Sequence, residues 1–194
     1  HHPAMRFVAP VRGELKIRTM MNVLGPMTNP ANAKNQIIGV FAPAWQNRMI
    51  EVLRTLGSER ALTVHSGGLD EFSIASPATV VELYNGEVRD YQVTPEEVGL
   101  KTQPIEGLTC SSPESSLSLI REALTVVDSP AAKIVAFNAG AALYVAGVTN
   151  TIKSGVELAQ TTISEGKAAE RLSALADLSQ SLTGTTHQPE DSDA

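Results

Sequence analysis

A strand–helix–strand pattern in the first third of the chain limits the possible folds more than any other feature. Residues 36–41 form a short apolar run that is typical of a buried strand. Pro43 suits the first turn of a helix, and Gly57 suits its end. Residues 61–65 form a second run of the buried-strand type. Two such strands joined through one helix are typical of a parallel pair, so the pattern predicts an α/β fold. The helix residues expected to point inward are Trp45, Met49, Val52, Leu53 and Leu56.

The next part of the chain has the two-residue period of an antiparallel hairpin. Residues 79–84 and 87–93 flank Asn85 and Gly86, the strongest short signal for a tight hairpin turn. We therefore expect a mixed, largely parallel sheet flanked by helices.

Helical spacing dominates the rest of the chain. Ser112 and Pro113 form a cap and first-turn signal for a helix that turns Leu117 and Ile120 inward. Three more helices are expected before residue 182. We expect residues 1–182 to form one unit, the C-terminal part of an α/β domain, and residues 183–194 to be a disordered tail.

Charge and composition exclude several classes of protein. The 194 residues carry a formal net charge of -6, which argues against a surface that binds duplex nucleic acid. The longest apolar runs are much shorter than a membrane span. Cys110 is the single cysteine, so neither an intramolecular disulfide nor a multi-cysteine zinc site can form. We expect a cytoplasmic protein that binds neither nucleic acid nor a membrane.

Two polar stretches are candidates for a functional site. Residues 4–16 predict a helix that carries Arg12, and residues 22–30 follow it with two Gly/Asn-Pro pairs that predict a loop. One arginine beside small polar residues suits a small, flat anion. Asp70 and Glu71 follow a strand end and a glycine pair, where loops of parallel sheets place functional groups. Adjacent acids are often only a solvated turn, but two carboxylates also suit Mg²⁺.

Several segments resemble those of anthranilate phosphoribosyltransferases. The likeness runs from residue 1 to about residue 180. The segments that carry it are His2-Pro3-Ala4-Met5, Val11-Arg12, Arg18-Thr19, Asn22 to Pro30, Gly68 to Glu71 and Asn138 to Gly147. Members of this family also have an N-terminal helical domain, a glycine-rich phosphate-binding loop and a basic loop ahead of the His-Pro-Ala-Met motif. The resemblance therefore implies that this chain corresponds to the C-terminal part of such an enzyme.

The resemblance implies a reaction as well as a fold. Enzymes of this family join the amine of anthranilate to C1 of phosphoribosyl pyrophosphate and expel pyrophosphate, an early step of tryptophan biosynthesis. No nucleophilic side chain is required, so no catalytic residue is expected. The family's magnesium accompanies the pyrophosphate and is assigned to Asp70 and Glu71. The parent enzyme is expected to form a homodimer through its helical domain, and the 194-residue chain alone is expected to be inactive.

The resemblance also assigns four residues to the anthranilate site. Arg12 would hold the carboxylate of anthranilate, and His2 and Met5 would line the path of the aromatic ring. Pro26 lies in a loop that closes over this substrate. Structural interpretations compete with these roles: a surface salt bridge for Arg12, a purification tag for His2, core packing for Met5 and a rigid turn for Pro26.

Two other functions stay open from the sequence. A pyrimidine nucleoside phosphorylase of the same fold would offer no carboxylate for Arg12 to bind, and a non-catalytic homologue would bind ligand without turnover. We interpret Asn138 to Gly147 as a close helix-packing segment, because it is rich in alanine and glycine. His65 is expected to be structural, and Cys110 is not expected to act as a nucleophile.

Overall fold

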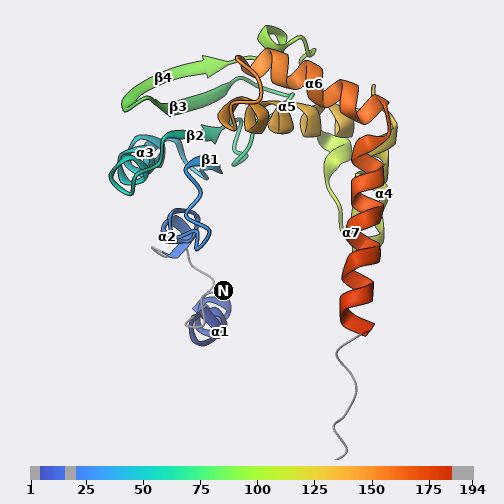
Figure 1. Ribbon diagram of the computed structural model, residues 1–194, viewed down its shortest axis with the longest axis horizontal. Helices are drawn as coiled ribbons and strands as arrows, with labels where there is room; N and C mark the ends of the chain where they lie inside the picture. The colour runs from blue at the N-terminus through green and yellow to red at the C-terminus, as the bar shows by residue number, and fades with distance from the viewer. Residues whose placement is uncertain (1–4, 16–20, 185–194) are drawn as a thin grey trace, which may run out of the picture.

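The computed structural model describes residues 5–15 and 21–184 and contains one four-stranded mixed sheet with helices on both faces (Figure 1). The strands lie in the order β1 (Asn35–Gly39), β2 (Arg60–His65), β3 (Ala78–Tyr84) and β4 (Glu87–Val93). The pair β1–β2 is parallel, whereas β2–β3 and β3–β4 are antiparallel. The prediction of a mixed α/β sheet is confirmed, but "largely parallel" is wrong for these four strands. No helix separates β2 from β3, and without such a crossover the next strand returns antiparallel.

Seven α-helices and three short 3₁₀ turns accompany the sheet in the described residues. They are α1 (Met5–Leu15), α2 (Met21–Met27), η1 (Pro43–Trp45), α3 (Gln46–Thr55), η2 (Glu96–Val98), η3 (Glu106–Leu108), α4 (Pro113–Thr125), α5 (Pro130–Val145), α6 (Ile152–Ser164) and α7 (Lys167–Gly184). Within the described ranges, no helix has both the length and the apolar character needed to cross a membrane. Residues 185–194, most of the expected tail, lie outside the description.

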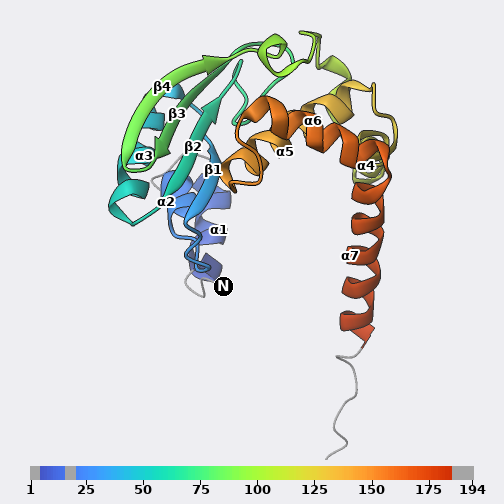
Figure 2. The same ribbon diagram turned by 45° about the horizontal axis from the view of Figure 1, so that its top comes forward.

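The sheet is the middle of three layers (Figure 2). On one face, Met49, Ile50 and Leu53 of α3 pack in a cluster with residues of β1, β2 and β3. On the other face, α5 and α6 contribute Phe137 and Val156 to a core shared with β2 and β3. Burial of these apolar side chains on both faces is what holds the layers together.

Helices α5 and α6 approach each other closely at a pair of glycines. A β-carbon at Gly155 would lie 2.8 Å from the carbonyl carbon of Gly140, closer than real β-carbons come to another atom. The observed contact agrees with the interpretation of residues 138–147 as a close-packing segment.

The hairpin has the turn that its sequence predicts. Asn85 and Gly86 have φ angles of 51° and 83°, as a two-residue primed turn requires, and Tyr84 pairs with Glu87. Ser112 also caps α4 as expected, because its side chain accepts a hydrogen bond from the backbone N–H of Ser115.

Two expectations about local structure are wrong. Residues 22–27 form most of α2 rather than a loop, because the fixed φ of Pro26 is compatible with a helix and costs little near the end of a short one. Four residues expected to point inward are largely exposed. They are Val52, Leu56, Leu117 and Ile120.

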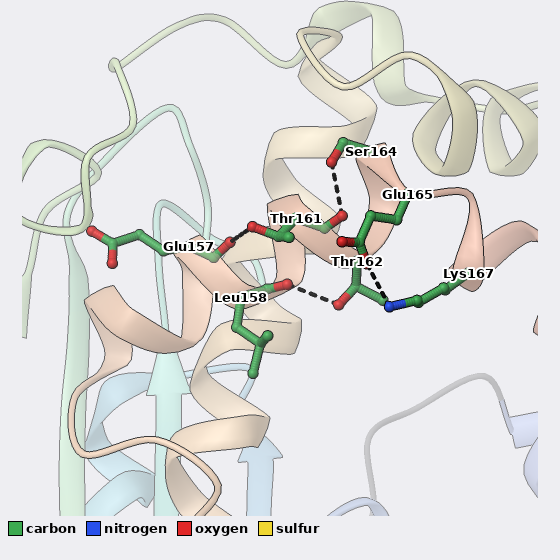
Figure 3. Close-up of polar contacts among 7 residues, drawn as sticks. All are labelled: Glu157, Leu158, Thr161, Thr162, Ser164, Glu165 and Lys167. Atoms are coloured by element: carbon green, nitrogen blue, oxygen red, sulfur yellow. Dashed lines mark hydrogen bonds and ion pairs between the residues drawn. The ribbon is translucent and has the colours of Figure 1, made fainter.

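The junction of α6 and α7 is ordered by local polar contacts (Figure 3). The hydroxyls of Thr161 and Thr162 donate to backbone carbonyls one turn earlier, at 2.9 and 2.8 Å. Gly166, with a φ of 75°, ends the turn between the helices, and Lys167 pairs with Glu165 across it at 2.6 Å. These bonds satisfy side chains of the helix junction locally, within one turn of each residue.

Candidate functional site

A tight turn after β2 presents the acidic pair. The backbone N–H of Ser66 donates to the carbonyl of Leu69 at 3.0 Å, and the reverse bond measures 2.9 Å. Gly67 and Gly68 have φ angles of 56° and 89°, which residues with a β-carbon rarely adopt. The glycine pair therefore turns the chain within two residues, and the acids follow after Leu69.

The turn brings the acidic pair against the end of β1. A β-carbon at Gly39 would lie 2.6 Å from the carbonyl carbon of Asp70 and would overlap its oxygen. Only a glycine leaves room for this contact. The backbone of Asp70 is thus fixed beside the carboxyl end of a parallel strand, the place where α/β sheets bind ligands.

The loop of residues 66–77 that carries the pair is closed at its base. The hydroxyl of Ser66, a residue that is 1% exposed, lies 3.0 Å from the hydroxyl of Ser76 and 3.1 Å from the carbonyl oxygens of Ser76 and Pro77. These contacts join the two ends of the loop, so the loop projects as a defined unit.

The two carboxylates are available for a cation. Asp70 and Glu71 are both exposed, and neither carboxylate has a hydrogen bond or an ion pair with the described residues. Partial desolvation raises the pKa of the Glu71 carboxyl, and the neighbouring charge of Asp70 raises it further. Two adjacent carboxylates that repel each other and lack a partner favour a divalent cation between or beside them.

Magnesium fits this donor set. No cluster of three or more His, Cys, Asp or Glu side chains suited to a metal occurs in residues 5–15 and 21–184. Zinc and similar metals need such a cluster, whereas Mg²⁺ is commonly held by one or two carboxylates and completes its shell with water and substrate phosphates. Asp70 and Glu71 are the residues that would hold it.

The acidic pair and Pro26 line one hollow. Its volume is about 610 Å³, within the range of small-molecule sites, and β1 forms its floor. Asn29 also lines it, and the Asn29 side chain accepts a hydrogen bond from the backbone of Ala31 at 3.0 Å. The structure thus brings together Pro26, Asp70 and Glu71, which the family resemblance assigns to substrate and metal.

Three of the predicted residues are not placed at side-chain level. His2 lies outside the described residues, and Met5 and Arg12 lie in α1 with only their backbone described. His65, expected to be structural, donates from Nδ1 to the carbonyl of Val40 at 2.8 Å. Its role as a hydrogen-bonded structural residue is confirmed.

Sequence reasoning missed Gly39 and Ser66, two residues that position the acidic loop. Gly39 interrupts an otherwise apolar strand, which is a recognised sign of close backbone approach. Ser66 carries no comparable signal, because its partners lie ten and eleven residues further along the chain.

Comparisons with known proteins identify the family of the chain. The model of the glycosyl transferase family, a/b domain, matches residues 1–169. The anthranilate phosphoribosyltransferase of Pseudomonas putida F1 is 49% identical over 90% of this chain and 52% of its own length. That of Saccharophagus degradans is 48% identical over 92% of this chain and 54% of its own length.

Solved structures of anthranilate phosphoribosyltransferases are also similar to this chain. The anthranilate phosphoribosyltransferase of Thermus thermophilus superimposes with a TM-score of 0.80 at 46% identity, covering 89% of this chain and 51% of that one. The Saccharomyces cerevisiae enzyme, in complex with PRPP and Mg, gives a TM-score of 0.75 at 25% identity, covering 89% and 50%. The chain spans about half the length of the relatives it matches. Because the family model covers most of its residues, the chain belongs to the glycosyl transferase family with this a/b domain.

Proposed function

We propose that the full-length protein transfers the phosphoribosyl group of phosphoribosyl pyrophosphate to the amine of anthranilate. The products are N-(5-phosphoribosyl)anthranilate and pyrophosphate. The observation that carries this proposal is the similarity to anthranilate phosphoribosyltransferases at nearly half identity over nine tenths of the chain. The hollow that Pro26 shares with the acidic pair supports it, because one small-molecule site then contains both sets of assigned residues.

In this proposal Asp70 and Glu71 hold magnesium. The yeast relative in complex with PRPP and Mg supports the choice of ion. When bound, Mg²⁺ stabilises the charge that develops on the departing pyrophosphate. The chain itself contributes two carboxylates on a loop whose backbone Gly39 and Ser66 hold in place.

For anthranilate, we propose that Arg12 binds the carboxylate through its planar guanidinium. His2 and Met5 line the path of the ring, and Pro26 covers it. Binding the two substrates side by side accelerates the reaction by orientation, so no side chain needs to attack the sugar. Because these 194 residues span about half the length of the relatives they match, we propose that they are inactive by themselves.

Steady-state kinetics of the full-length protein test the assignment of anthranilate. Arg12→Ala should raise the KM for anthranilate by about tenfold or more, because a charge-assisted contact is lost, with the KM for phosphoribosyl pyrophosphate nearly unchanged. Equal losses for both substrates would contradict the role of Arg12. Turnover of thymidine with phosphate would favour a pyrimidine nucleoside phosphorylase, and binding without turnover would favour a non-catalytic homologue.

A magnesium titration tests the metal site. The double variant Asp70→Asn, Glu71→Gln should need a much higher Mg²⁺ concentration for half-maximal turnover. The matched control is Glu96→Gln, Glu97→Gln, which neutralises another adjacent acidic pair whose carboxylates bond to the backbone of Thr102 and Thr94. Identical titrations for the two double variants would refute the site.

The proposal also includes a cytoplasmic homodimer for the parent protein. A single cysteine fits a reducing compartment. Light scattering of the full-length protein during gel filtration tests the oligomeric state, and a monomeric mass at micromolar concentration would contradict the dimer.

A further inference from the structure

Asn138 on α5 binds the backbone of the residue that follows the acidic pair. Its Oδ1 accepts the backbone N–H of Phe72 at 3.0 Å, and its Nδ2 donates to the carbonyl of Phe72 at 2.9 Å. A second hydrogen of Nδ2 is donated to the carbonyl of Ile134 at 3.0 Å. Both amide hydrogens and the amide oxygen are therefore used, which fixes the orientation of the side chain.

The neighbouring residue on α5 holds the side chain of Phe72. The rings of Phe72 and Phe137 stack with centroids 4.6 Å apart, and both residues are 0% exposed. Consecutive residues of one helix thus bind the ring and the backbone of Phe72. Ring packing alone sets how deep Phe72 lies, whereas the paired hydrogen bonds also set the rotation of its peptide groups.

The acidic pair lies between two fixed points. Gly39 admits the backbone of Asp70 on one side, and Phe72 begins at the next bond after Glu71. Close packing between α5 and α6 explains the glycines of the segment 138–147 but not its asparagine. The Asn138 amide lies in an alanine-rich helix, yet its oxygen and one of its hydrogens bind a residue 66 positions earlier in the chain, which helix packing does not explain.

We propose that Asn138 is a positioning residue for the carboxylates of Asp70 and Glu71. It acts through the backbone of Phe72 and does not touch the metal or the substrates. This inference rests on the proposed magnesium site. No other side chain of similar size offers both a donor and an acceptor at this distance, because aspartate lacks the donor and glutamine is longer by one methylene.

Two variants of the full-length protein test the role of Asn138, and a third is their control. Asn138→Ala removes all three hydrogen bonds, and Asn138→Asp keeps an acceptor for the Phe72 N–H but loses both donors. Tyr144→Phe is the control, because it removes one hydrogen bond of the same helix, from the Tyr144 hydroxyl to Glu82 on β3 at 2.6 Å, and leaves the bonds to Phe72 in place. One readout is hydrogen exchange of the Phe72 amide in metal-free protein, and the other is the Mg²⁺ concentration for half-maximal turnover.

For Asn138→Ala we expect exchange at Phe72 to be at least about tenfold faster and half-saturation by Mg²⁺ to rise by about five- to tenfold. Asn138→Asp should retain much of the protection at Phe72 but show an intermediate shift with Mg²⁺. The KM for anthranilate should change little in either variant. Tyr144→Phe should lower the Tm and leave half-saturation by Mg²⁺ within about twofold of the wild type.

Unchanged half-saturation in Asn138→Ala, or an equal shift in Tyr144→Phe, would overturn the positioning role. If Asn138→Ala does not fold, the test rests on the nearly isosteric Asn138→Asp. An Mg²⁺ half-saturation in that variant equal to that of the wild type would then refute the proposal. Wild-type protein without magnesium-dependent turnover would refute the proposed function instead, and the positioning role with it. If the wild type shows magnesium-dependent turnover and the Asn138 variants have the same Mg²⁺ half-saturation, only the role of Asn138 is refuted.

Discussion

The backbone of Asp70 lies directly on Gly39, at a distance that leaves no room for a β-carbon on the strand residue. Two segments separated by a helix and a strand meet at this point. The contact places the acidic pair over the end of β1 and at the edge of the hollow that Pro26 also lines.

Gly39→Ala should therefore displace the acidic loop. We expect a loss of about 1–3 kcal/mol in the free energy of unfolding, typical of overpacking, together with a higher Mg²⁺ requirement. Urea unfolding and a magnesium titration of the full-length protein measure the two effects. Gly107→Ala is the matched control, because no atom lies within 4 Å of its added β-carbon. If Gly39→Ala changes neither the free energy of unfolding nor the Mg²⁺ requirement, this contact does not set the position of the loop.

Gly155→Ala should separate α5 from α6. The added methyl would meet the carbonyl of Gly140, and backbone cannot move aside as a flexible side chain can. We expect a loss of about 1–3 kcal/mol or more in the free energy of unfolding, measured by urea denaturation. A Tm equal to that of the wild type would mean that the helices separate at no cost.

Glu82 is a buried carboxylate, and the stability of the protein depends on the groups that bond to it. It is 3% exposed, accepts a hydrogen bond from Tyr144 at 2.6 Å and pairs with Nε of Arg89 at 3.2 Å. Tyr144→Phe should cost about 1.5–3 kcal/mol in the free energy of unfolding, because the acceptor is charged. Tyr84→Phe makes the same chemical change at a hydroxyl with no hydrogen bond to the described residues. Equal losses for the two variants would contradict the importance of the Tyr144 bond.

Tyr91 should make the protein sensitive to alkali. Burial raises the pKa of its phenol well above the usual value, and the charge of Glu82 raises it further. The folded state thus favours the neutral phenol. Its stabilising contribution is complete below the unfolded pKa of about 10 and is lost as the pH rises above that value towards the raised pKa of the folded state.

The measurement is the urea midpoint of wild type and Tyr91→Phe between neutral pH and about pH 11. The wild type should lose more stability than the variant above about pH 10. Parallel alkaline losses in the two proteins would show that Tyr91 does not titrate differently on folding.

Local signals predicted most of the elements. The Asn85-Gly86 turn, the Ser112 cap and the run that became β2 depend on residues within a few positions of one another. Backbone conformation at such places follows from sterics and short hydrogen bonds, which a sequence displays directly. The same reasoning failed at Pro26, where a general helix breaker lies inside α2.

Contacts between distant segments were not predictable in this way. Nothing near Asn138 in the sequence indicates that its partner is Phe72, and the space above Gly39 depends on a turn that comes 27 positions later at Ser66. The exposure of Leu117 and Ile120 was also not predictable from local sequence. Helical spacing defines an apolar face, but it does not say whether another segment covers that face. The acidic pair was predicted from its place after a strand, and the structure places it beside the carboxyl end of β1, at the edge of the hollow.

The glycine contact between α5 and α6 has a consequence for the acidic pair. Gly140 lies two residues after Asn138, so a bulkier residue at Gly155 would shift the helix that binds the backbone of Phe72 next to the acidic pair. A mutation in this helix layer, which contributes no residue to the acidic pair, would then raise the magnesium requirement of the full-length protein.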